Sequence, residues 1–166
     1  MRVFLSGATG FLGRALVLAL RNGGHTVVAW VRDPARARDL LGAEAELLPM
    51  QSGDGNLAPA LAGCDAVVNL AGEPILSRWS ATRRAALRAS RVDLTARLVR
   101  AHGASARRPT VLLSGSAVGF YGEGGDEFLS ETSGRGQGFL AELCVEWETA
   151  ARAAEPLGTR VVLLRT

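Results

Sequence analysis

A glycine-rich turn close to the amino terminus constrains the fold of this chain more than any other segment. The turn, Gly7–Gly13, reads GATGFLG and follows directly after an apolar, strand-like stretch at residues 2–6. An amphipathic, helix-like segment then runs from Phe11 to Asn22 and ends at Gly23-Gly24, as helices commonly do. A strand, a glycine-rich turn and a helix in this order are typical of the first part of a βαβ unit.

Strand-like and helix-like segments alternate along the rest of the chain. Helical connections between strands give right-handed crossovers and a parallel sheet that is covered on both faces. We therefore predict one α/β domain over residues 1–166, a doubly wound parallel (Rossmann) sheet with strand order 3-2-1-4-5-6. Further strands are predicted at residues 25–31, 45–50, 65–70, 109–115 and 159–165, and further helices at 34–41, 57–62, 80–102 and 139–155.

The glycines of the turn suit close contact with an anion. Gly7 allows a tight turn off the strand, Gly10 lets the main chain approach a diphosphate, and Gly13 lets the helix pack close to the sheet. The helix start adds unpaired N–H groups and the positive end of its dipole. A plain glycine-rich turn is the alternative, but the flanking strand and helix favour a dinucleotide site. We predict that the diphosphate is held by Gly7, Thr9, Gly10, Phe11, Leu12 and Gly13.

The end of the second strand distinguishes between the two nicotinamide dinucleotides. NAD-binding proteins commonly place an acidic residue there for the ribose 2′-hydroxyl, whereas an arginine suits the 2′-phosphate of NADP. In this chain Val31 occupies the acidic position, Arg32 comes next, and Asp33 is placed to cap the following helix. We predict that Val31 and Arg32 line the adenosine ribose and that the cofactor is NADP rather than NAD. The alternative is that Arg32 is an ordinary surface arginine.

Several segments besides the glycine turn resemble one family. They are NLAGEPI at 69–75, Ser90-Arg91 with Thr95, SGSAVGFYG at 114–122, and FLAELC at 139–144 with Trp147-Glu148. Together they resemble the atypical extended short-chain dehydrogenases/reductases, sugar-nucleotide epimerase-like proteins of which some bacterial members are labelled cell-division inhibitors. The resemblance covers essentially the whole chain and implies a NAD(P)-binding fold with NADP(H) as cofactor. Because members of this family continue into a C-terminal substrate domain, we expect this chain to be a fragment that lacks it.

The resemblance also implies roles for residues after the fourth strand and in the helix that follows. It places Leu70, Ala71 and Gly72 along the cofactor, where a backbone loop passes beside the ribose. It places Arg91 where extended members usually carry an asparagine. Arg91 then either reaches a cofactor phosphate or ribose, or is a solvated arginine on the helix surface.

The catalytic residues that the resemblance implies are present only in part. Ordinary members use a serine or threonine after the fifth strand, together with a tyrosine and a lysine one helical turn apart. Ser116 can supply the hydroxyl, and Ser114, the second choice, is also expected beside the cofactor. The tyrosine and lysine positions hold Leu140 and Cys144 when Glu148 is aligned with the glutamate that usually follows the lysine.

The chain contains no lysine, and Tyr121 is its only tyrosine. Tyr121 follows the fifth strand, where it either faces the nicotinamide or packs with its hydroxyl in solvent. We name Ser116 and Tyr121 as the candidate catalytic residues. The carboxylates near the strand ends, Glu73 among them, are expected to be solvated, and we assign them no role.

Composition argues against several other classes of function. The absence of lysine excludes a P-loop and a Schiff-base enzyme, and the two cysteines and two histidines lack metal-ligand spacing, so we predict no metal site. The net charge of +3 is spread along the chain, which argues against nucleic acid as a partner. No apolar run approaches the roughly 18 residues of a membrane span, and no secretory signal is evident, so we expect no membrane partner and a cytoplasmic location.

We expect either an NADP-dependent oxidoreductase or epimerase acting on an unidentified small molecule, or an NADP(H)-binding sensor or scaffold without turnover.

Overall fold

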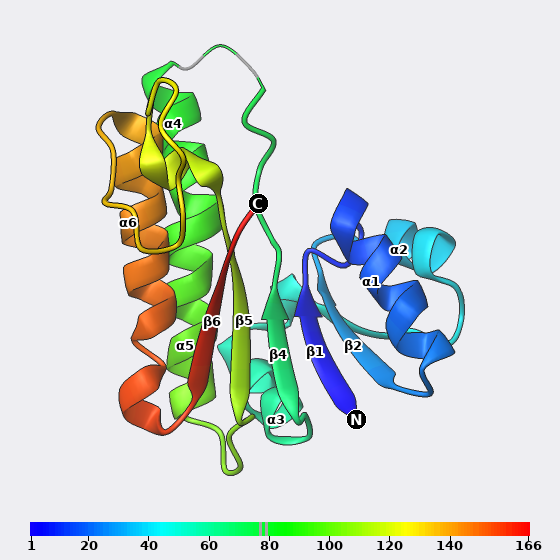
Figure 1. Cartoon of the computed structure of the whole chain (residues 1–166). Helices are drawn as coiled ribbons and strands as arrows, with labels where there is room; N and C mark the ends of the chain where they lie inside the picture. The colour runs from blue at the N-terminus through cyan, green and yellow to red at the C-terminus, as the bar shows by residue number, and fades with distance from the viewer. Residues whose placement is uncertain (77, 79) are drawn as a thin grey trace.

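The predicted strands form one parallel sheet (Figure 1). In this computed structural model, which describes residues 1–76, 78 and 80–166, the strands are β1 (Arg2–Ser6), β2 (Thr26–Val31), β3 (Glu46–Pro49), β4 (Ala66–Asn69), β5 (Val111–Ser116) and β6 (Arg160–Arg165). Every neighbouring pair is parallel, and the order is β3-β2-β1-β4-β5-β6. The doubly wound order predicted from the sequence is therefore confirmed.

Helices cover the two faces of the sheet. They are α1 (Phe11–Asn22), α2 (Pro34–Leu41), α3 (Leu57–Ala62), α4 (Ala81–Arg88), α5 (Leu94–Gly103) and α6 (Phe139–Arg152), with short turns η1 (Met50–Ser52), η2 (Asp54–Asn56), η4 (Val118–Tyr121) and η5 (Glu155–Leu157). Successive strand residues point to opposite faces. In β1, Val3 and Leu5 therefore pack with α1 and α2, whereas Phe4 packs with α3, α5 and α6.

The single helix predicted for residues 80–102 is interrupted. A π-helical turn, η3 (Ala89–Asp93), joins α4 to α5. The spacing of apolar residues over a long segment does not reveal one wider turn, so the sequence pattern missed it. Single π-helical turns inside helices occur frequently at functional sites. Here the turn carries Ser90 and Arg91, both of which contact the loop after β4.

The carboxyl ends of the strands bring the predicted site segments together. Because the strands are parallel, the turn after β1, the residues after β2, the loop after β4 and the end of β5 lie at one edge of the sheet, here named the carboxyl edge. Ligands of doubly wound sheets bind at this edge, where the strand order reverses. Among the described residues, no helix combines the length and the apolar character that crossing a bilayer requires.

Candidate functional site

The glycine turn between β1 and α1 has room only for glycine at two positions. Gly7 has a φ of +75°, and a Cβ atom on it would lie 2.6 Å from the carbonyl oxygen of Leu70. A Cβ atom on Gly13 would lie 2.1 Å from the carbonyl oxygen of Gly7. Both distances are shorter than van der Waals contact, and backbone atoms do not move aside as a flexible side chain does. These glycines therefore allow α1 to approach β1 and the turn to approach the loop after β4.

The start of α1 is open toward the carboxyl edge. Gly10 occupies the N-cap position and provides no side chain to bind the first N–H groups of the helix. Thr9 is half-buried, whereas Leu12 is exposed and Phe11 is 85% exposed. Unpaired N–H groups and the positive end of a helix dipole suit a diphosphate. The turn thus fits the predicted dinucleotide, and its contact with a cofactor stays a prediction.

The end of β2 is followed by an exposed arginine. Val31 is buried in the core, whereas the side chain of Arg32 is 78% exposed. Asp33 caps α2 as predicted, because its carboxylate accepts the N–H of Arg36 at 3.0 Å. Asp33 therefore caps the helix, and Arg32 is the exposed cation of this segment that suits a phosphate.

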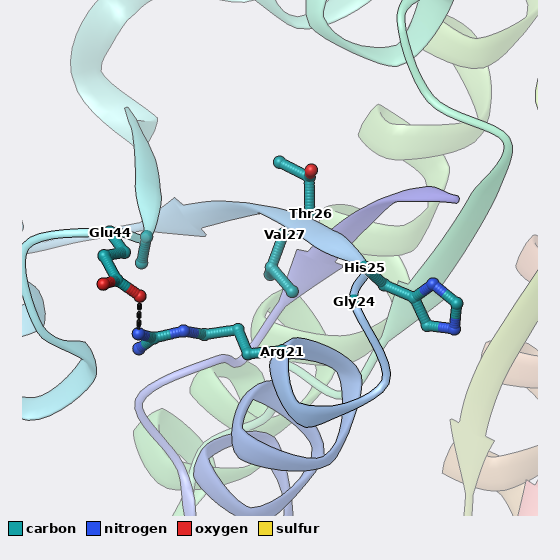
Figure 2. A pocket seen from close by; sticks show the side chains of 7 residues that line it. Arg21, Gly24, His25, Thr26, Val27 and Glu44 are labelled. Atoms are coloured by element: carbon teal, nitrogen blue, oxygen red, sulfur yellow. Dashed lines mark hydrogen bonds and ion pairs between the residues drawn. The ribbon is translucent and has the colours of Figure 1, made fainter.

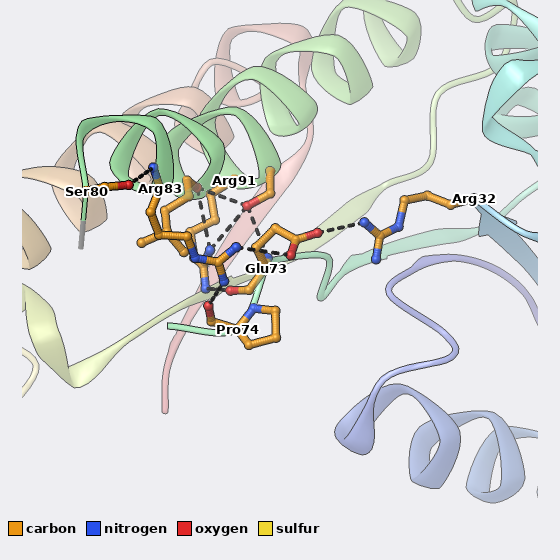
Figure 3. A network of polar contacts seen from close by, with 8 residues as sticks. Arg32, Glu73, Pro74, Ser80, Arg83 and Arg91 are labelled. Carbon is orange, nitrogen blue, oxygen red and sulfur yellow. Dashed lines mark hydrogen bonds and ion pairs between the residues drawn. The ribbon is translucent and has the colours of Figure 1, made fainter. Parts of the chain in front are cut away.

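Arg32 reaches across the carboxyl edge to the loop after β4 (Figure 3). Its Nη1 donates to Oε1 of Glu73 at 2.7 Å, and Nη1 of Arg83 lies 3.6 Å from Oε2 of the same carboxylate. The hydrogen bond from Arg32 lowers the pKa of Glu73 from its ordinary value, although partial burial acts in the opposite direction. Glu73, expected to be a solvated carboxylate, is 27% exposed and is also flanked by two arginines.

The π-helical turn holds the loop after β4, which begins with residues 70–72. The Oγ of Ser90 accepts the N–H of Glu73 at 3.1 Å, and Nη2 of Arg91 donates to the Glu73 carbonyl oxygen at 2.9 Å. The guanidinium of Arg91 lies 5.4 Å from the ring centre of Trp147, and burial lowers its pKa. The alternative of a solvated helix arginine is therefore wrong for Arg91. Its contact with a cofactor stays a prediction.

A buried hydrogen-bond network joins the ends of β1, β4 and β5. Asn69 lies at its centre, since its Oδ1 accepts from Ser6 Oγ at 2.5 Å, and its Nδ2 donates to Thr95 Oγ1 at 2.8 Å and to Ser114 Oγ at 3.4 Å. Nε1 of Trp147 also donates to Thr95, at 3.0 Å. Ser114 is fully buried, so its hydroxyl serves this network. A contact between Ser114 and a cofactor would involve the backbone atoms of Ser114, and this contact stays a prediction.

The two candidate catalytic residues are joined through a buried ion pair. Ser116 Oγ donates to Oε1 of Glu148 on α6 at 2.6 Å. The same carboxylate accepts from Nε and Nη2 of Arg165, at the end of β6, at 2.7 and 2.9 Å. Nη1 of Arg165 in turn donates to the hydroxyl of Tyr121 at 2.9 Å. We call these four residues the Glu148–Arg165 cluster.

The Glu148–Arg165 cluster keeps its charges despite being largely buried. The side chains of Glu148 and Arg165 are only 7% and 16% exposed. Burial raises the pKa of Glu148, but hydrogen bonds from Arg165 and Ser116 outweigh it and hold the pKa below its ordinary value. The hydrogen bond to Glu148 raises the pKa of Arg165. Tyr121 is half-buried and its hydroxyl accepts a hydrogen bond from Arg165, and its contact with the nicotinamide stays a prediction.

The sequence pattern did not reveal the pairing of Glu148 with Arg165. A usable signal exists, because Glu148 lies on the buried face of α6 with Cys144 and Ala151, and a glutamate on an apolar helix face needs a buried partner. Cys144, which stands at the position of the missing lysine, cannot supply a positive charge there. Burial raises the pKa of its thiol, and its Sγ faces the carbonyl oxygen of Ala117 at 3.8 Å.

Two small hollows lie away from the carboxyl edge. One, of about 200 Å³, lies between the end of α1 and the start of β2, beside the ion pair of Arg21 and Glu44 (Figure 2). The other, of about 260 Å³, lies between α1 and α2. The first is at the amino end of its parallel strand, opposite the glycine turn, and the second is lined by helix side chains alone. We assign neither a role in the site.

The fold and the glycine turn together define a NAD(P)-binding domain of the short-chain dehydrogenase/reductase type. Residues 3–166 match the NAD dependent epimerase/dehydratase family, and the chain belongs to this family. The epimerase family protein Mb2239 of Mycobacterium bovis is 44% identical over 166 residues, which cover 99% of this chain and 52% of that protein. Human SDR39U1, also an epimerase family protein, is 32% identical over 170 residues, which cover 100% of this chain and 54% of that protein.

Solved structures agree with this assignment. Human SDR39U1 with NADPH superposes with a TM-score of 0.79 at 32% identity, covering 99% of this chain and 53% of that one. A short-chain dehydrogenase/reductase superfamily protein of Agrobacterium tumefaciens with bound NAD gives a TM-score of 0.76 at 25% identity, covering 99% and 48%. This chain therefore spans about half the length of the curated relatives it matches. The family and the fold predicted from the sequence are both confirmed.

Proposed function

We propose that this chain is the NADP(H)-binding domain of an oxidoreductase or epimerase that acts on a small molecule. The observation that carries the proposal is the glycine turn, which offers bare main chain and the start of α1 at the carboxyl edge. Residues 7–13 would hold the diphosphate, Arg32 the 2′-phosphate, and residues 70–72 the ribose. When bound, such a cofactor accepts or donates a hydride, which protein side chains do not do.

The end of β2 supports NADP over NAD. Buried Val31 stands where NAD-binding proteins commonly carry an acid, and the exposed side chain of Arg32 follows it. Relatives of known structure include one with NADPH and one with NAD. The proposed preference therefore rests on the residues of this chain.

Ser116 and Tyr121 are the side chains to which we assign proton chemistry. Because Ser116 donates its hydroxyl hydrogen to Glu148, its oxygen is left to accept a hydrogen bond from a substrate hydroxyl. Because Arg165 donates to the oxygen of Tyr121, the hydroxyl hydrogen of Tyr121 is left to point at a substrate oxygen. One ion pair thus orients an acceptor and a donor, which compensates in part for the tyrosine and lysine that α6 lacks.

Arg32→Ala should weaken NADPH binding about 10- to 100-fold and leave NADH binding within about twofold. Only NADPH carries the 2′-phosphate, and a hydrogen bond to a charged group contributes about 1.5–3 kcal/mol. Fluorescence titration with both dinucleotides measures the effect. Arg160→Ala, which removes an exposed arginine at the amino end of β6, is the control for charge. Equal losses for both dinucleotides would contradict the 2′-phosphate assignment, and a wild type that binds neither below millimolar concentration would contradict the proposed function.

Ser116→Ala and Tyr121→Phe should each lower turnover by about 100-fold or more, because general acid–base groups contribute about 10²–10⁴-fold. Both variants should bind NADPH as the wild type does, since neither side chain is assigned to the cofactor. The measurement is NADPH oxidation with a panel of carbonyl compounds. If a full-length protein that carries this domain binds NADPH but neither reduces these compounds nor epimerises sugar nucleotides, a sensor without turnover becomes the better description.

A further inference from the structure

The ion pair of Arg32 and Glu73 spans the proposed nucleotide site. Arg32 follows β2, Glu73 lies in the loop after β4, and β1 with its glycine turn lies between those two strands. Figure 3 shows the Arg32 side chain extended toward Glu73, with Arg83 and Arg91 on the far side of the carboxylate. The same guanidinium that is proposed for the 2′-phosphate is therefore engaged by an anion of the protein itself.

Glu73 is the fixed partner of this pair. Its backbone is bound on both sides by the π-helical turn, through Ser90 Oγ at 3.1 Å and Arg91 Nη2 at 2.9 Å. Its side chain is 27% exposed, whereas that of Arg32 is 78% exposed. A long, exposed arginine can change rotamer at little cost. Binding of a ligand to Arg32 would therefore move the arginine rather than the carboxylate.

We propose that Glu73 is a specificity-determining residue, whose carboxylate competes with the 2′-phosphate of NADP(H) for Arg32 and thereby moderates the preference for NADP(H) over NAD(H). This inference rests on the proposed function. The direction of the effect does not depend on how Arg32 moves. If Arg32 leaves Glu73, their ion pair is lost, and if Arg32 bridges both groups, the carboxylate and the phosphate repel each other at close range. A dinucleotide without the 2′-phosphate experiences neither effect.

Arg83 keeps the competition moderate. Its Nη1 lies 3.6 Å from Oε2 of Glu73, so the carboxylate retains a cationic neighbour when Arg32 turns toward a phosphate. The pair that is lost is also partly exposed, and exposed ion pairs contribute only weakly. The carboxylate should therefore reduce NADPH affinity by about two- to fivefold.

The experiment compares NADPH and NADH titrations of the wild type and of Glu73→Gln. The amide retains the shape of the side chain and removes its charge, so NADPH should bind about two- to fivefold more tightly and NADH as before. Glu155→Gln is the matched control, because Glu155 also forms an exposed ion pair, with Arg152 at 2.9 Å, but lies in η5 away from the carboxyl edge. If the control tightens NADPH binding equally, the effect is one of net charge and the proposal is overturned.

A double-mutant cycle tests whether Arg32 transmits the effect. In the Arg32→Ala background, Glu73→Gln should leave NADPH affinity unchanged, because the side chain for which the two anions compete is absent. The proposal is overturned if Glu73→Gln weakens NADPH binding, alters NADPH and NADH equally, or acts equally without Arg32. If the wild type binds NADPH, any of these variant results overturns the role of Glu73 but leaves the proposed function intact. If the wild type binds neither dinucleotide, the role of Glu73 and the proposed function are both overturned.

Discussion

Gly13→Ala should remove measurable NADPH binding and lower the stability of the fold. The added Cβ atom would lie 2.1 Å from the carbonyl oxygen of Gly7 and 2.8 Å from the Cα of Ala8, both backbone atoms. Relief of these contacts requires α1 to move away from β1, which distorts the turn that would hold the diphosphate. Overpacking of a well-packed site typically costs about 1–3 kcal/mol. NADPH titration and urea unfolding of the variant measure the two effects.

Gly134→Ala is the matched control for this substitution. A Cβ atom on Gly134 would meet no other atom within 4 Å, and the residue does not have a positive φ. Its stability and NADPH affinity should equal those of the wild type. Undiminished NADPH binding by Gly13→Ala would contradict the assignment of this turn as the diphosphate site.

Arg165→Met should lower the free energy of unfolding by about 3–5 kcal/mol, because it leaves a buried carboxylate without its cation. Glu148 is 7% exposed and would keep only the hydrogen bond from Ser116. Tyr121 would lose the donor that orients its hydroxyl. Urea unfolding at neutral pH measures the loss.

Two further variants separate the buried ion pair from a general loss of charge. Arg152→Met removes the partner of Glu155 from an exposed pair and should cost less than about 1 kcal/mol. Adding Glu148→Leu to Arg165→Met should recover part of the lost stability, because apolar replacement of a whole buried pair is often close to neutral. An Arg165→Met protein as stable as the wild type would show that Glu148 does not depend on its cation.

The elements around the site could be predicted because their patterns involve residues that are close together in the sequence. Gly7 and Gly13 are required by contacts within the turn and with the strand end beside it, and Asp33 caps a helix through an N–H three residues later. Alternating strands and helices admit few topologies once crossovers are right-handed, so the strand order also followed. The π-helical turn at Ala89–Asp93 was not predicted from the sequence. One additional residue in a turn leaves the spacing of apolar residues within each flanking helix nearly unchanged.

The sequence by itself determined the glycine turn and the position of Arg32 at the end of β2, because both depend on residues that are close along the chain. It also determined the sheet order, because right-handed crossovers leave few topologies for alternating strands and helices. Only the tertiary structure decided the partners of the charged side chains. Arg32 meets Glu73 across 41 residues, and Glu148 meets Arg165 across 17. Apolar periodicity indicates whether a side chain faces the core, but its partner depends on which strands and helices the fold places side by side.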